Sequence, residues 1–402
     1  MATAPDHEDL AILGGKPVRE TMLPYGRQSV SEADVAAVVE VLRSDWLTTG
    51  PKVGEFEEAF AAAVGAKFAV SFSSGTGALH GAAFTAGLGP GDEAVTTPMT
   101  FCATANCVLY QGGTPVFADV SSDTLNLDPD RVKEKISPRT KTILPVDYAG
   151  HAADLGALMG IAEQHGLIVI EDASHALGGE YQGRRVGSLA HMTTFSLHPV
   201  KHLTTGEGGM VTTDRADFAE TLRRFRNHGI SSEARQRQSA GQWHYDMVLL
   251  GMNYRLPDIN CALGLSQLPR LGANLARRRA IAATYASRLA GLPGLILPST
   301  RVGVSLAWHL YPVRLDPAKI SAGRDEVFRA LRAENIGVNV HYIPVHLHPY
   351  YRERFGYRGG EFPVAEAAYE GLISLPMFHG MSDEDVDDVI RALCKVISHY
   401  AR

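Results

Sequence analysis

Largely apolar, strand-length segments alternate with helical patterns between residues 68 and 228, and this alternation constrains the fold more than any other feature of the chain. The strand-like segments lack the polar–apolar alternation of a strand with one solvated face, so both faces of the sheet should be covered. Helices between successive strands are the connections that parallel pairing requires. We therefore expect an α/β fold with a mostly parallel sheet. The expected strands are Phe68–Phe72, Glu93–Thr97, Pro115–Asp119, Thr142–Val146, Leu167–Glu171, Met192–Ser196 and Met210–Thr213.

Helices are expected around and between these strands. Ser31 and Asp34 have the spacing of a capping box, so a helix should follow Ser31. The further helices should cover Lys52–Val64, start at Ala78, and cover Phe101–Tyr110, Leu155–His165 and Phe218–His228.

The pattern changes after about Pro257. A long helical region, Leu256–Leu289 with a break near Pro269, should lead to a second lobe, because 402 residues are long for a single core. That lobe is expected to contain strands near Leu306–Leu315 and Gly337–Tyr342 and helices over Arg324–Glu334, Val364–Leu372 and Ser382–His399. The sequence predicts an N-terminal arm over 1–30, a large domain over 31–262 and a smaller α+β domain over 263–402.

Charge and composition exclude several classes of function. A net charge of −6 argues against a general nucleic-acid-binding surface, and the basic clusters Arg277–Arg279 and Arg235/Arg237 are short enough to be solvated faces. The four cysteines form no C-x-x-C pair and are expected to be reduced. The acidic N-terminus lacks the apolar region of a signal peptide, and no segment is long and apolar enough to span a bilayer. We expect a cytoplasmic protein.

The stretch F-S-S-G-T-G-A-L-H (Phe72–His80) follows an expected strand and opens a helix. Its small residues leave backbone N–H groups free to face an anion at the helix N-terminus. The glycine pattern imitates a dinucleotide fingerprint, but His80 stands at the third glycine position. A phosphate site, a nicotinamide cofactor site and a plain tight turn all remain open for this stretch alone.

Two further positions have one functional and one structural interpretation each. Asp172 ends a buried strand, where ligands of open α/β sheets bind, so it could meet a cationic ring nitrogen or a metal; capping a turn is an equal alternative. Phe101 could stack on an aromatic ring, although core packing is the commoner role of such a residue. His341, His346 and His348 resemble metal ligands, but no neighbouring carboxylate or cysteine matches them, and no metal site is expected.

Lys201 lies in F-S-L-H-P-V-K-H-L-T-T-G-E-G-G, just after an expected strand and five residues after Ser196. A surface lysine does not require this setting, whereas an amine that captures a carbonyl group does. A phosphate cradle, a stacking aromatic ring, an aspartate at a strand end and this lysine together meet the needs of pyridoxal 5′-phosphate (PLP). Each feature is modest alone, and their combination indicates PLP.

These stretches resemble the DegT/DnrJ/StrS family of sugar aminotransferases, and the resemblance covers nearly the whole chain. Other matching stretches include T-T-P-M-T-F-C-A-T-A-N, V-D-Y-A-G-H, I-E-D-A-S-H-A-L-G, R-N-H-G, G-M-N-Y-R-L-P-D-I and H-Y-I-P-V-H. S-D-W-L-T-T-G-P and H-P-V-K-H-L-T-T-G-E-G-G are most similar to PseC-like UDP-4-amino-4,6-dideoxy-N-acetyl-L-altrosamine transaminases, whereas L-G-G-K-P-V-R is more similar to antibiotic-sugar and aminocyclitol members. The family implies the fold of type I PLP enzymes, the aspartate aminotransferase-like fold, with a large mixed sheet.

The resemblance also implies roles for individual residues. Lys201 would bind the PLP aldehyde covalently and then move the proton, and Asp172 would pair with the ring nitrogen. His175 would lie near the ring's phenolic oxygen, Phe101 would cover the ring, and Asn253 would reach the phosphate bound by a neighbouring subunit. The phosphate would be held by Ser74, Gly75, Thr76 and Ser196. The substrate pocket would use Trp46, Thr49, Gly50, His151, His198, Tyr311, His341 and Tyr342.

The implied function is transfer of an amino group from L-glutamate to the C4 ketone of a nucleotide-linked 4-keto-6-deoxy sugar, with UDP favoured, by a homodimer with shared active sites. Pyridoxamine 5′-phosphate (PMP) would be the intermediate form of the cofactor. Alternatives are amination of a 3-keto dTDP-sugar or keto-cyclitol, with glutamine as a possible donor, and a non-catalytic PLP-fold regulator. A sugar 3-dehydratase is disfavoured because such members have histidine where Lys201 stands here.

Overall fold

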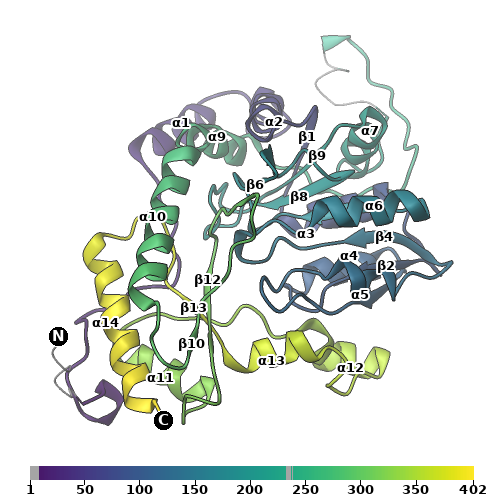
Figure 1. The fold of residues 1–402 in the computed structure, drawn as a ribbon. Helices are drawn as coiled ribbons and strands as arrows, with labels where there is room; N and C mark the ends of the chain where they lie inside the picture. Colours follow the sequence, from purple (N-terminus) through teal and green to yellow (C-terminus); the bar gives the residue numbers. More distant parts are fainter. Residues whose placement is uncertain (1–8, 232–236, 238) are drawn as a thin grey trace.

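The computed structural model of the chain describes residues 9–231, 237 and 239–402. Residues 1–8 of the expected arm and the basic residue Arg235 lie outside the described residues. Two bodies are visible in Figure 1: a sheet covered by helices, and a second lobe built around α10 and α14. Within the described residues, no helix combines the length and apolarity that crossing a membrane requires.

The large sheet has seven strands in the order β1-β9-β8-β5-β4-β2-β3. The pairs formed by β2, β3, β4, β5 and β8 are parallel, while β9 pairs antiparallel with both β1 and β8. The sheet is therefore mixed and mostly parallel, as expected. Its strands are β1 (Phe68–Phe72), β2 (Glu93–Thr96), β3 (Thr114–Phe117), β4 (Thr140–Leu144), β5 (Ile168–Asp172), β8 (Met192–Ser196) and β9 (Gly209–Thr213).

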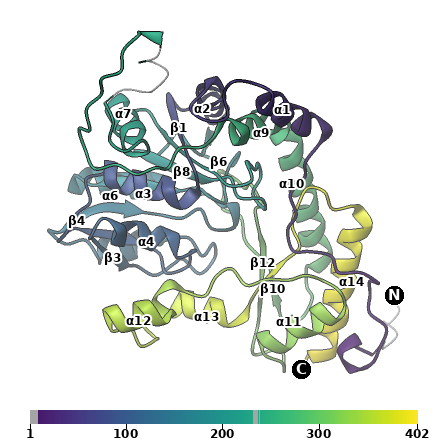
Figure 2. The ribbon, with the colours of Figure 1, turned by 180° about the vertical axis from the view of Figure 1, so that it is seen from behind.

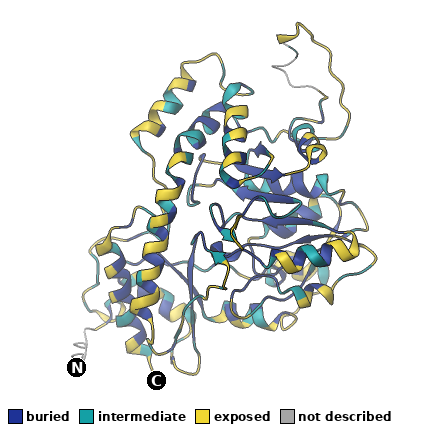
Figure 3. Ribbon diagram, turned by 45° about the horizontal axis from the view of Figure 1, so that its top comes forward, coloured by how far each residue is buried: buried dark blue, intermediate teal, exposed yellow. Residues whose placement is uncertain are grey.

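Helices cover both faces of this sheet, which explains why its strands are apolar on both sides (Figure 2). Successive residues of β5 show the two faces, because Val169 packs with α6 and Ile170 packs with α3, α4 and α7. Burial is concentrated in the strands, and exposed residues lie on the outer sides of the helices (Figure 3). The helices of this body are α1 (Glu32–Leu42), α2 (Pro51–Val64), α3 (Gly75–Thr85), α4 (Ala103–Tyr110), α5 (Pro129–Lys133), α6 (Leu155–His165), α7 (Ala216–Phe225) and α9 (Asp258–Gln267).

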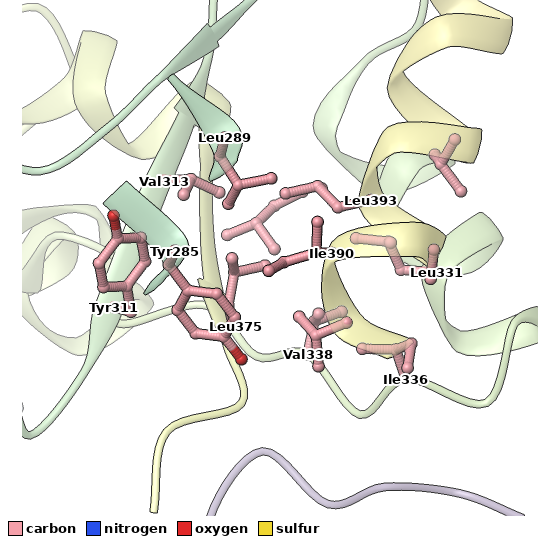
Figure 4. Close-up of a cluster of buried hydrophobic side chains, with 14 of the residues drawn as sticks. Tyr285, Leu289, Tyr311, Val313, Leu331, Ile336, Val338, Leu375, Ile390 and Leu393 are labelled. Atoms are coloured by element: carbon pink, nitrogen blue, oxygen red, sulfur yellow. The ribbon is translucent and has the colours of Figure 1, made fainter. Parts of the chain in front are cut away.

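The second lobe packs its helices against a three-stranded sheet of order β10-β12-β13. In its apolar core, Leu289 of α10 and Leu331 of α11 gather with Leu393 of α14 (Figure 4). Leu10 and Leu23 of the N-terminal segment belong to the same core. The break expected near Pro269 is present as a short 3₁₀ turn, Leu268–Arg270, between α9 and α10. The lobe contains α10 (Leu271–Leu289), α11 (Arg324–Ala333), α12 (Pro349–Phe355), α13 (Pro363–Gly371), α14 (Asp383–Tyr400), β10 (Leu295–Ile296), β12 (Tyr311–Leu315) and β13 (Leu372–Leu375). A small sheet of β11 (Val304–Ser305), β6 (Glu180–Tyr181) and β7 (Arg184–Arg185) lies between the larger elements.

One expected strand is wrong. Residues 337–342 form no named strand, and their one ladder contact is an isolated bridge between Asn339 and Ser374. The segment leaves the sheet there, because Asn339, His341 and Tyr342 turn to line a cavity. β12 pairs with β10 on one side and with β13 on the other, and β13 begins at Leu372, the last residue of the expected helix Val364–Leu372. The expected boundaries of the arm and of the two domains remain a prediction.

Candidate active site

The carboxyl ends of β1, β5 and β8 open into a cavity of about 550 Å³. Ligands of open α/β sheets bind at this edge. Residues of the second lobe close the opposite wall of the cavity. The lining includes eleven of the predicted site residues: Ser74, Gly75, Thr76, Phe101, Asp172, His175, Ser196, His198, Lys201, His341 and Tyr342.

The N-terminus of α3 forms one end of the cavity. Ser74 caps the helix, and its Oγ accepts a hydrogen bond from the Gly77 N–H at 3.0 Å. Within the described residues, the N–H groups of Gly75 and Thr76 have no protein acceptor. A Cβ on Gly75 would lie 2.9 Å from the Ser196 Cβ, so glycine lets β8 approach the helix end. Two free N–H groups beside two serine hydroxyls fit a phosphate.

Asp172 forms the floor of the cavity and is only 4% exposed. Its Oδ2 accepts a hydrogen bond from the Thr104 hydroxyl at 2.7 Å, and its Oδ1 accepts one from the Ser174 hydroxyl at 2.6 Å. Oδ1 also accepts a hydrogen bond from the Ser174 N–H. Asp172 therefore stabilises its own turn, as the structural alternative predicted, and also lines the cavity. A fixed, acceptor-only carboxylate at this depth fits a cationic ring nitrogen.

Phe101 lies just before α4, which begins two residues later than expected. Its ring is 56% exposed, so the alternative of core packing is wrong. On the same cavity wall, the Tyr342 ring lies 6.1 Å from Phe101. Tyr342 also forms a 2.9 Å hydrogen bond between its hydroxyl and His175 Nε2, and the two rings stack. These flat side chains fit the walls of a slot for an aromatic ring.

Lys201 projects its amine into the cavity beside a histidine that the sequence reasoning had missed. Its Nζ lies 3.5 Å from His309 Nε2. Burial lowers the pKa of Lys201 to about 8, with Asp172 acting to raise it and Arg278 to lower it. A lysine with this pKa is present in part as the free amine near neutrality, which nucleophilic attack on a carbonyl group requires. His309 lies in A-W-H-L-Y, where no motif marks it.

Two predicted substrate residues, Tyr311 and His151, lie away from the cavity and make structural contacts instead. Tyr311 is 1% exposed, because its ring packs between Tyr285 and Trp308 in the core of the second lobe. His151 is buried, and its ring nitrogens contact the Ala152 carbonyl and the Arg301 N–H. The structure therefore places neither residue at the cavity.

Four of the predicted residues lie in another part of the same chain. Thr49 and Gly50 line a separate cavity of about 160 Å³, whose wall also includes Arg255. Asn253 forms a backbone bridge with Asn227 beside that cavity. Trp46 is packed against Gly50, because a Cβ at Gly50 would lie 2.5 Å from the Trp46 Cβ. A single chain does not bring these four residues to Lys201.

Two of the three histidines of the 341–348 segment, His341 and His346, lie in different surroundings. His341 lines the cavity with its Nδ1 2.9 Å from the Ser374 hydroxyl, and burial lowers its pKa to about 4. His346 lies instead beside Glu361 and Glu366, with its Nε2 2.9 Å from Glu366. The expectation that no carboxylate accompanies these histidines is therefore wrong for His346, because Glu361 of the loop after α12 and Glu366 of α13 lie beside it.

The carboxylates beside His346 already have protein donors. Glu361 accepts hydrogen bonds from the N–H groups of Arg358 and Gly359. Glu366 accepts hydrogen bonds from Gly360 and Phe362 in the same way. In this part of the described chain the two carboxylates stabilise the loop at 358–362, and backbone N–H groups already satisfy their oxygens.

Comparison with known proteins agrees with a cavity that fits PLP. The DegT/DnrJ/EryC1/StrS aminotransferase family matches residues 28–394. The spore coat polysaccharide biosynthesis protein SpsC of Bacillus subtilis is 44% identical over 381 residues, covering 94% of this chain and 98% of SpsC.

Solved structures share the fold over 94% of this chain. PseC of Helicobacter pylori, an aminotransferase of pseudaminic acid biosynthesis, superposes with a TM-score of 0.88 at 32% identity, covering 94% of this chain and 100% of PseC. Spr1654 of Streptococcus pneumoniae in its PMP form has a TM-score of 0.89 at 32% identity, covering 94% of this chain and 99% of Spr1654, which is also known in a PLP form. The chain therefore belongs to the DegT/DnrJ/EryC1/StrS aminotransferase family, and it is a PLP-dependent sugar aminotransferase of fold type I.

Proposed function

We propose that the enzyme moves an amino group from L-glutamate to the C4 ketone of a nucleotide-linked 4-keto-6-deoxy sugar, with a UDP-sugar as the favoured acceptor. The proposal rests on one observation: Lys201, Asp172 and the N-terminus of α3 line the same cavity at the carboxyl edge of the sheet. The names of SpsC and PseC, which concern polysaccharide and pseudaminic acid biosynthesis, support an amino-sugar product.

Each group in the cavity has a proposed task. The N–H groups of Gly75 and Thr76 and the hydroxyls of Ser74 and Ser196 hold the phosphate. Asp172 pairs with the ring nitrogen and keeps it protonated. When bound, PLP supplies an electron sink that accepts the electron pair left by proton removal.

Lys201 is the proposed general base. Once its amine is free, Nζ takes a proton from the α-carbon of glutamate and delivers it to the C4′ carbon of the cofactor. In the second half-reaction Nζ moves a proton in the opposite direction, from C4′ to C4 of the sugar. The lowered pKa of Lys201, about 8, supports this task because the base must be unprotonated near neutral pH. Phe101 and His175 are the proposed walls of the ring slot, and they keep the reacting face away from bulk water.

The acceptor sugar is proposed to enter on the side of Lys201 that the second lobe covers. His198, His341 and Tyr342 line that side, and their polar atoms suit sugar hydroxyls and a ketone oxygen. His341 lies in an environment that disfavours its charged form. A neutral imidazole can donate a hydrogen bond to a carbonyl oxygen without repelling the Lys201 ammonium.

The active unit is proposed to be a homodimer. Trp46, Thr49, Gly50 and Asn253 lie around a separate cavity or beside it in the isolated chain. In a dimer with shared sites, these residues would complete the phosphate and substrate pockets of the partner. Mixing an Asn253→Ala chain with a Lys201→Ala chain tests this sharing, since complementation requires that each chain contribute to the other's site.

A half-reaction screen tests the substrate. The enzyme is converted to its amine form with L-glutamate, or with L-glutamine as the alternative donor, and freed of the keto acid. UDP- and dTDP-linked 4-keto and 3-keto sugars are then added, and the return of PLP absorbance is followed. We expect UDP-linked 4-keto-6-deoxy sugars to restore the band fastest. If only a free cyclitol ketone restores it, the nucleotide-sugar proposal fails.

A further inference from the structure

His309 has an unusual hydrogen-bonding position. Its imidazole is buried, and its Nδ1 has no partner within the described residues. The hydrogen-bond partner that this part of the chain offers the ring is Lys201 Nζ, 3.5 Å from Nε2. Buried imidazoles usually satisfy their nitrogens with structural partners. The contact with the Lys201 amine therefore suggests that the position of the His309 ring serves that amine.

The backbone around His309 is shaped to hold the ring there. Trp308 has a φ of +51°, a conformation that bulky residues rarely adopt. The N–H of His309 donates to the Ala149 carbonyl at 3.0 Å, which anchors the turn to the large domain. Gly150 allows this approach, because a Cβ there would lie 2.7 Å from the Trp308 N and 3.0 Å from the His309 N.

Arg278 of α10 clamps the same turn from the other side. Its Nη1 donates to the carbonyls of Trp308 at 3.1 Å, His309 at 3.3 Å and Met377 at 2.9 Å. The guanidinium is 1% exposed, and its recorded hydrogen bonds go to carbonyl oxygens rather than to a carboxylate. Burying an arginine without a carboxylate partner is costly. The hydrogen bonds of Arg278 therefore indicate that the position of the Trp308–His309 turn matters to the protein.

The surroundings of the imidazole disfavour its charged form. Burial lowers the pKa of His309 well below its ordinary value, and Lys201, His175, His202 and Arg278 act in the same direction. The His175 and His202 rings lie 4.4 Å and 5.6 Å from the His309 ring, between centroids. A neutral ring with its hydrogen on Nδ1 leaves the Nε2 lone pair to accept an N–H from Lys201.

We propose that His309 is a positioning residue for Lys201. Its Nε2 accepts a hydrogen bond from the Lys201 amine, which turns the amine lone pair toward the cavity, and Arg278 with Gly150 holds the imidazole in place. The task applies whenever Lys201 is free of the cofactor, both before covalent attachment and during proton transfer. The inference rests on the proposed role of Lys201.

The test separates attachment from binding. Holoenzyme of wild type, His309→Leu and His309→Gln is stripped of cofactor and reloaded with PLP. Equilibrium binding of PLP and the rate of its covalent attachment are measured separately, the latter from the visible band. The rate and half-saturation of the L-glutamate half-reaction are measured on the same proteins. His379→Leu is the control, because His379 is a half-buried histidine near Arg278 whose Nδ1, like that of His309, has no partner within the described residues, and no hydrogen bond joins it to Lys201 there.

For His309→Leu we expect attachment and half-reaction rates to fall about a hundredfold while PLP affinity and the half-saturation for glutamate stay within about threefold. His309→Gln should recover most of the rate, because its Oε1 can accept where Nε2 did. Rates of His309→Leu equal to those of His379→Leu would overturn the inference. Equal losses of affinity and rate with a lowered Tm would also overturn it, since a purely structural residue behaves in that way. Covalent attachment in a Lys201→Ala chain would instead contradict the proposed function, whatever the His309 variants show.

Discussion

Thr104 donates a hydrogen bond of 2.7 Å to the Asp172 carboxylate, although the two residues are 68 positions apart. The contact joins the first turn of α4 to the end of β5, and Thr100 extends it with a 2.7 Å bond to the Thr104 hydroxyl. The anion on the cavity floor is thus oriented by a neighbouring helix as well as by its own turn. This arrangement fixes the position of the carboxylate that we propose to pair with the ring nitrogen of PLP.

Removing the Thr104 hydroxyl should weaken PLP binding. Thr104→Val keeps the shape of the side chain and leaves the carboxylate short of one donor, and a hydrogen bond to a charged group contributes about 1.5 to 3 kcal/mol. We expect the Kd for PLP to rise about tenfold to a hundredfold, measured by equilibrium titration. Thr85→Val is the control, because the buried Thr85 hydroxyl has no hydrogen-bond partner among the residues that the structure describes. An equal effect of the two substitutions would contradict the role of Thr104.

Neutralising Asp172 should affect rate more than binding. Asp172→Asn retains the size of the side chain but loses the charge that keeps the ring nitrogen protonated. We expect the L-glutamate half-reaction to slow by about a hundredfold or more in single-turnover absorbance measurements. Asp154→Asn, at the N-terminal cap of α6, serves as a control for the loss of a capping carboxylate away from the cavity. A half-reaction at the wild-type rate in Asp172→Asn would remove Asp172 from the mechanism.

Adding a methyl group at Gly209 should damage the phosphate site. A Cβ there would lie 2.3 Å from the Ser74 carbonyl oxygen and 2.8 Å from the Gly75 nitrogen, so β9 and the start of α3 would have to separate. We expect Gly209→Ala to lower Tm and to reduce PLP affinity. Gly160→Ala in α6 meets no atom within 4 Å and should be neutral or stabilising by up to about 1 kcal/mol. Normal PLP binding by a folded Gly209→Ala protein would show that the cradle tolerates movement.

The pKa of Lys201 predicts a change of stability with pH in the cofactor-free chain. Burial lowers this pKa from 10.5 in the ordinary state to about 8. Between these values the unfolded chain binds the proton that the folded chain has lost, so stability rises with pH across that window. Below about pH 8 both states are protonated, and the charged lysine carries its full desolvation cost.

Replacing Lys201 by methionine should remove that cost. At pH 7 we expect the free energy of unfolding of cofactor-free Lys201→Met to exceed that of wild type by roughly 3 kcal/mol. The difference should shrink as pH rises from about 8 toward 10.5. Chemical denaturation at several pH values measures it, with Lys67→Met as the control for loss of an exposed lysine. A difference that is constant with pH would contradict the lowered pKa.

The parts of the fold that local pattern determines were predicted. Apolar strands separated by helices led to the mostly parallel sheet, and a strand followed by S-S-G-T-G led to the free N–H groups at α3. Asp172 was found because it stands at the end of one strand, and Lys201 because it lies five residues after Ser196, the last residue of another. Strand ends of such a sheet meet at one edge. These residues lie in the cavity as expected.

The remaining features depend on contacts between distant segments. His309 is placed by Arg278 and by the close approach at Gly150, and no local pattern carries that information. Residues 337–342 alternate like a strand, but the segment leaves β13 after one bridge to line the cavity. Tyr311 faces Tyr285 rather than the cavity because the register of β12 on β13 sets its direction.

The most direct test of the account is the Lys201→Ala enzyme reconstituted with PLP, assayed with L-glutamate and the best nucleotide-linked keto sugar from the substrate screen. We expect PLP to bind through the phosphate cradle without forming the visible band of the covalent linkage, and we expect no amino sugar to appear by mass spectrometry. Amino-sugar formation at a rate comparable to wild type would contradict the central claim that Lys201 forms the linkage and moves the proton.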